Sequence, residues 1–132
     1  DPTAELAFLA MTAAERKLVP EDWQRLSKLP TELLATPAGE YVQGMMALRQ
    51  GLADEAIERL LKAEPQHDGR HLYELALAYT VSAAAENTEK AIAALNLLHK
   101  DYPNSSLARH ARSFVRQLSP QPASASDNDE KR

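Results

Sequence analysis

The chain has 132 residues and no cysteine, which excludes disulfides, thiolate metal sites and cysteine nucleophiles. Fifteen Lys and Arg against nineteen Asp and Glu give a formal net charge of −4, which argues against general binding to nucleic acid. Aromatic residues make up 5% of the chain and glycine occurs four times, whereas alanine and leucine abound. This composition predicts an all-α fold in a single domain.

Proline, glycine and capping residues divide the chain into predicted helices. The first runs over residues 3–18, with Leu and Ala on one stripe at helical spacing. Pro20 opens a second helix, which carries Trp23 as a predicted core residue and stops before Pro30, and a short piece follows at 31–35. The later helices are expected over residues 37–50, 53–64, 69–85, 89–100 and 106–118. Their predicted N-caps are Thr36, Asp68, Thr88 and either Asn104 or Ser105.

The two ends of the chain differ from its body. Residues 119–132 contain no large apolar side chain, so they cannot offset the entropy of ordering, and a disordered tail that the fold does not need is predicted. The chain begins with Asp1 and Pro2 instead of an initiator Met, which favours a mature or trimmed form and leaves open an upstream leader, anchor or domain. No apolar run approaches the length that spans a bilayer, so this segment is not expected to insert into a membrane.

An internal repeat is visible in the middle of the chain. The tripeptides Glu-Ala-Ile and Lys-Ala-Ile place Ala56 and Ala91 35 residues apart, close to the repeat length of about 34 in tetratricopeptide proteins. The small residues Gly44 and Ala76 lie 32 apart. Two helices can cross closely only where both carry small side chains, so we expect Gly44 and Ala56 to face each other at a helix crossing.

This pattern resembles the tetratricopeptide family, in which Gly51 would be the turn glycine and Pro103 the closing proline. Pro65 comes early for that pattern, and the second unit has no turn glycine. The resemblance covers residues 37–118 and implies antiparallel helix hairpins stacked as a short right-handed superhelix. The implied single domain, residues 1–118, comprises a degenerate hairpin (3–35), two repeats (37–65 and 69–103) and a terminal helix (105–118).

The phrase that begins at Asp101 and runs Asp-Tyr-Pro-Asn-Ser-Ser-Leu-Ala-Arg-His-Ala is more specific. It resembles the repeat junctions of bacterial cell-envelope tetratricopeptide proteins, such as outer-membrane assembly lipoproteins and the periplasmic Tol–Pal coordinator. That resemblance implies a periplasmic or envelope-associated protein. A generic repeat junction in a cytoplasmic protein is the alternative.

Few side chains are arranged for chemistry. His67 and His71 have a spacing that can chelate a metal, but Asp68 between them is better placed as a helix cap and no third ligand is apparent. The sequence contains no phosphate loop, nucleophile elbow or His-Glu-x-x-His helix. We therefore expect no cofactor, no metal and no catalytic residues.

The tetratricopeptide resemblance implies an adaptor that binds a partner protein or peptide on its concave face. Aromatic, Met and Arg residues on one surface are typical of binding hot spots, and Arg49 would receive an acidic group. The family geometry assigns this contact to Tyr41, Met45, Arg49, Tyr73, Leu77, Thr80, His110 and Phe114. Alternatively, a neighbouring domain or the chain's own first hairpin covers this stripe.

Two other hypotheses remain open at this point. One is a structural or oligomerising module of a larger anchored envelope complex. The other is a small all-helical enzyme. The sequence leaves the oligomeric state undecided.

Overall fold

The computed structural model describes residues 1–15, 18–82, 84 and 86–119, so the predicted tail beyond Ser119 lies outside it. Within the described residues the fold is all-α, as predicted, and none of its helices is long and apolar enough to cross a membrane. The described part of the chain forms eight helices: α1 (Pro2–Glu15), α2 (Pro20–Ser27), α3 (Thr31–Leu34), α4 (Pro37–Arg49), α5 (Ala53–Leu61), α6 (Arg70–Val81), α7 (Asn87–Asp101) and α8 (Ser106–Leu118).

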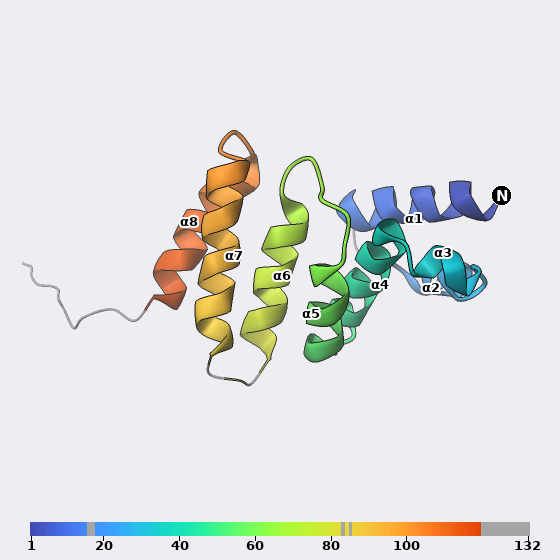
Figure 1. Ribbon diagram of the computed structural model, residues 1–132, viewed down its shortest axis with the longest axis horizontal. Helices are drawn as coiled ribbons and strands as arrows, with labels where there is room; N and C mark the ends of the chain where they lie inside the picture. Colours follow the sequence, from blue (N-terminus) through green and yellow to red (C-terminus); the bar gives the residue numbers. More distant parts are fainter. Residues whose placement is uncertain (16–17, 83, 85, 120–132) are drawn as a thin grey trace, which may run out of the picture.

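From α4 onward each helix packs against the next in the chain, and α4 through α8 form a row (Figure 1). Small residues lie where neighbouring helices meet, since Ala56, Ala76 and Ala91 are all fully buried. The close approach predicted at Gly44 is present. A Cβ atom added at Gly44 would lie nearest to atoms of Leu60 and Arg59 of α5, about one turn beyond the expected Ala56.

The N-terminal segment does not pair as a simple hairpin. Helix α1 packs chiefly against α4 rather than α2, and it lies across the end of the row (Figure 1). It buries Leu6, Leu9 and Ala13, while α2 is joined to it through Arg25, whose guanidinium stacks 5.8 Å from the Phe8 ring centre. The segment therefore wraps α4 instead of adding a further layer to the row.

The connection between α5 and α6 begins earlier than expected, because α5 ends at Leu61 rather than at residue 64. Glu64 lies beyond the end of α5, and its N–H donates a hydrogen bond to the Pro37 carbonyl oxygen, 3.0 Å away. This bond ties the connection to the start of α4. It places the polar residues that follow Glu64 opposite α1.

Candidate partner-binding groove

Two residues of the predicted partner-binding face lie in the core. Tyr41 is 0% exposed and Met45 is 2% exposed, so the expectation that they form an open surface is wrong. The reason is that α4 is packed by α1, α3, α5 and α6 together. The chain's own N-terminal segment thus takes the place that a concave face would leave free.

The other predicted residues do not form one continuous surface. Tyr73 and Phe114 are half-buried and come together between α6 and α8, with ring centres 5.9 Å apart. Leu77 is half-buried, and its carbonyl accepts a hydrogen bond from the exposed Thr80 hydroxyl at 2.7 Å. His110 is exposed on α8.

Arg49 takes part in a charge cluster around the buried carboxylate of Glu74 rather than presenting a free cation. Its Nη2 lies 4.0 Å from Oε2 of Glu74, which Nη1 of Arg70 also approaches at 3.7 Å. Glu74 is 3% exposed, so burial raises the pKa of its carboxyl group, and Arg49 and Arg70 oppose that rise. Burial, reinforced by Glu74, likewise raises the pKa of Tyr41. The cluster therefore serves the packing of α4 against α6.

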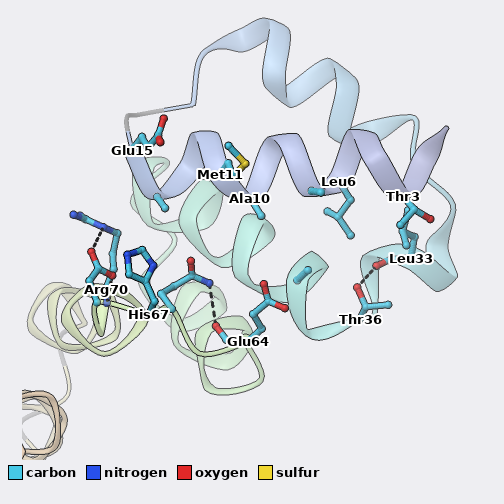
Figure 2. A pocket seen from close by; sticks show the side chains of 15 residues that line it. Thr3, Leu6, Ala10, Met11, Glu15, Leu33, Thr36, Glu64, His67 and Arg70 are labelled. Atoms are coloured by element: carbon cyan, nitrogen blue, oxygen red, sulfur yellow. Dashed lines mark hydrogen bonds and ion pairs between the residues drawn. The ribbon is translucent and has the colours of Figure 1, made fainter. Parts of the chain in front are cut away.

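A hollow outside the predicted contact residues lies between α1 and the α5–α6 connection (Figure 2). Its volume is about 810 Å³. One wall is apolar and belongs to α1: Leu6, Ala7, Ala10, Met11 and Ala14. The opposite wall is polar: Glu64, Gln66, His67, Asp68 and Arg70. Residues near the start of α4 close one end, and Thr3 and Glu15 complete the rim. None of the eight predicted contact residues lines this groove.

The polar wall is held in place by hydrogen bonds. The Gln66 N–H donates to Nδ1 of His71 at 2.9 Å, and the Arg70 N–H donates to Oδ1 of Asp68 at 3.1 Å. The Ser105 hydroxyl donates to the Asp68 carbonyl at 2.7 Å, which anchors the wall to the start of α8. Gly69 has φ +79° and faces the Tyr102 ring, so a larger residue would meet both backbone strain and a close contact there. The wall is therefore preformed.

The groove combines apolar surface with negative charge. Met11 is 62% exposed, and Figure 2 shows Leu6 and Ala10 pointing from α1 into the hollow while Glu64 points in from the other side. Glu15 and Glu64 form no ion pair within the described part of the chain, whereas Asp68 is paired with Arg70 at 3.8 Å. The arrangement suits apolar side chains accompanied by a cation.

Sequence reasoning missed this groove because it searched the first helices of the repeats. A signal was present on α1, which carries apolar residues outside its buried stripe, at Ala7, Phe8 and Met11. A surface helix that is apolar on more than one side commonly has a second neighbour. The polar wall had no comparable signal, because its residues are brought there by the turn that follows α5.

His71 makes the polar wall sensitive to pH. Burial lowers the pKa of His71 below 6.5, with Asp68 opposing the shift, and Nδ1 must stay unprotonated to accept from Gln66. The folded state therefore binds this proton less readily than the unfolded state. Its contribution to stability is complete above pH 6.5 and is lost as the pH falls below that value.

We expect thermal unfolding to show this loss. The parent should lose stability between about pH 7 and about pH 5, whereas His71→Asn, whose amide oxygen can still accept from Gln66, should show a flatter profile. His67→Asn is the matched control, since His67 is exposed. Equal pH profiles for the parent and His71→Asn would show that the imidazole does not brace the wall.

Comparison with protein-family descriptions, curated proteins and solved structures gives no significant match for the chain. The tetratricopeptide resemblance, with the repeat superhelix and the envelope location that follow from it, therefore stays a prediction. Within the described residues no three His, Asp or Glu side chains gather as metal ligands would. The groove and its chemistry are thus the observations on which a function can be argued.

Proposed function

We propose that the domain is a protein-interaction adaptor and that the groove beside α1 binds a segment of a partner protein carrying apolar residues and a Lys or Arg. The observation that carries this proposal is the preformed hollow of about 810 Å³ with one apolar wall and two carboxylates, Glu15 and Glu64, that form no ion pair among the described residues. Its volume falls in the range of about 300–1,000 Å³ common to ligand sites. The envelope location is an expectation from the junction phrase and is independent of this argument.

Apolar contact would supply most of the affinity. Burying one Leu or Met side chain contributes about 1.5–3 kcal/mol, and ordering the partner segment opposes part of that gain. Two or three apolar anchors against Ala7, Ala10 and Met11 are therefore needed for stable binding. A cation near Glu64 adds little affinity at an exposed rim, but it selects which segment binds and in which direction.

Selection from a displayed library of random peptides tests the proposal with the full chain. Enriched peptides should share apolar residues and at least one Lys or Arg. Ala7→Glu places a charge on the apolar wall at an exposed position and should weaken their binding about tenfold or more. Ala4→Glu is the matched control, because Ala4 is exposed on the same helix but does not line the groove.

Charge reversal provides a second readout. Glu64→Lys should shift the enriched sequences from basic to acidic, whereas Glu58→Lys, exposed on α5 outside the groove, should not. Enriched peptides that bind Ala7→Glu as well as the parent would place the contact elsewhere. Self-association of the parent that Ala7→Glu abolishes would make the occupant a second copy of this chain, and the adaptor proposal would fail.

A further inference from the structure

The last helix carries a charge opposite to that of the chain as a whole. Helix α8 contains Arg109, Arg112 and Arg116 and no acidic residue, although the net charge of the chain is −4. Residues spaced three and four apart lie on one face of a helix, so these three guanidinium groups share one side. All three residues are exposed.

Two hollows lie along the line where α8 packs on α7, and they share His99 and Arg112. The first, of about 350 Å³, is also lined by Pro103, Asn104, Ser105, Ala108 and Arg109. The second, of about 260 Å³, is also lined by Leu95, Asn96, Val115 and Arg116. Together they form one seam, which we call the α7–α8 seam, and neither hollow is lined by an Asp or Glu.

Two of the seam's arginines, Arg109 and Arg112, are exposed and do not belong to the buried face that holds α8 in place. The helix is anchored by Leu107, Ala108 and Ala111, which are buried. Within the described residues Arg109 and Arg112 form no ion pair, and like charges at this spacing repel one another by a few tenths of a kcal/mol. An anionic partner would relieve that repulsion, because Arg binds carboxylates through two parallel hydrogen bonds.

We propose that the α7–α8 seam binds an acidic segment of a partner protein. Hollows of about 350 and 260 Å³ have room for Asp and Glu side chains, and the half-buried Val115 offers apolar contact for their methylene groups. A nucleic acid fits less well, because the acidic remainder of the chain repels a long polyanion. The helix N-terminus beside Ser105 adds a favourable dipole at one end of the seam.

This inference is independent of the proposed function. The groove is built on α1 and is acidic, whereas the seam is built on α7 and α8 and is basic, at the opposite end of the row of helices (Figure 1). If both are occupied, the domain joins two partners of opposite charge. Either site can fail without affecting the argument for the other.

Fluorescence anisotropy with a labelled peptide of alternating Glu and Ala tests the seam on the full chain. Arg112→Glu, which alters both hollows, should weaken binding at least tenfold, and added salt should weaken binding to the parent. Lys62→Glu makes the same change in charge at an exposed position outside the seam and should bind as the parent does. Ala7→Glu should also leave this binding unchanged.

Several outcomes would overturn the inference. Equal weakening by Lys62→Glu would show that only the overall charge matters, and loss of binding in Ala7→Glu would show that the peptide uses the groove. Tighter binding of a single-stranded DNA oligonucleotide than of the peptide would make the seam a nucleic-acid site. The triple variant Asp127→Asn, Asp129→Asn and Glu130→Gln removes acidic groups near the C-terminus. If the full chain with these changes binds the peptide much more tightly, its own C-terminal segment competes for the seam and is the occupant.

Discussion

Gly39→Ala is expected to lower the free energy of unfolding by about 2–4 kcal/mol. A Cβ atom at this position would collide with the Leu34 carbonyl oxygen and lie 2.6 Å from the Leu33 carbonyl oxygen. Both are backbone atoms, and the Gln43 amide and the Thr36 hydroxyl donate to them at 2.8 and 2.6 Å. The backbone between α3 and α4 therefore cannot move aside without breaking these bonds.

Gly44→Ala is the matched control. The atoms nearest to a new Cβ there are Cγ and Cδ2 of the buried Leu60, at 2.8 and 2.9 Å, so a side chain rather than the backbone has to shift. Replacing glycine by alanine inside a helix also gains about 1 kcal/mol, which offsets much of the crowding. In urea denaturation, the midpoint of Gly39→Ala should lie well below that of Gly44→Ala. The tight junction between α3 and α4 would be refuted if both variants unfolded at the parent's midpoint.

Local signals explain how far the helices could be predicted from the sequence. Thr36 was predicted as a cap and accepts from the Gly39 N–H at 3.2 Å, and Ser105 accepts from the Leu107 N–H at 3.0 Å. Both bonds join residues within three positions, so neighbouring residues suffice to specify them. The cap predicted at Thr88 is wrong, because α7 already begins at Asn87. Asn87 donates to the Ser82 hydroxyl at 2.8 Å, a contact across the turn that no local pattern reveals.

The candidate site was less accessible to sequence reasoning, because it is assembled from segments far apart in the chain. Its apolar wall comes from α1. Glu64 and Arg70 lie in the opposite wall because of where α5 ends and α6 begins. The small residues on which the repeat prediction rested, Ala56, Ala76 and Ala91, are buried. It could not show that α1 packs on α4, which is why Tyr41 and Met45, predicted as surface contacts, are core residues.

Replacing both Arg49 and Arg70 by Met is expected to lower the free energy of unfolding by about 2–3 kcal/mol. Glu74, 3% exposed, would then keep a buried carboxylate with neither of its two cations. The loss should be smaller than for a completely buried pair, because each arginine side chain is 30% exposed and partly screened by water. Arg49→Glu alone should also destabilise the fold, since it sets a second carboxylate beside Glu74.

The dependence on pH separates this electrostatic loss from simple loss of packing. Removing both arginines raises the pKa of Glu74 further, so the folded double variant holds a proton that the unfolded chain releases near pH 4.5. Its stability should therefore fall more steeply than the parent's as the pH rises above 4.5. Adding Glu74→Leu should restore most of the stability, because an apolar replacement of the whole cluster leaves no buried charge. If the triple variant is no more stable than the double variant, the arginines act through packing of their side chains and not through Glu74.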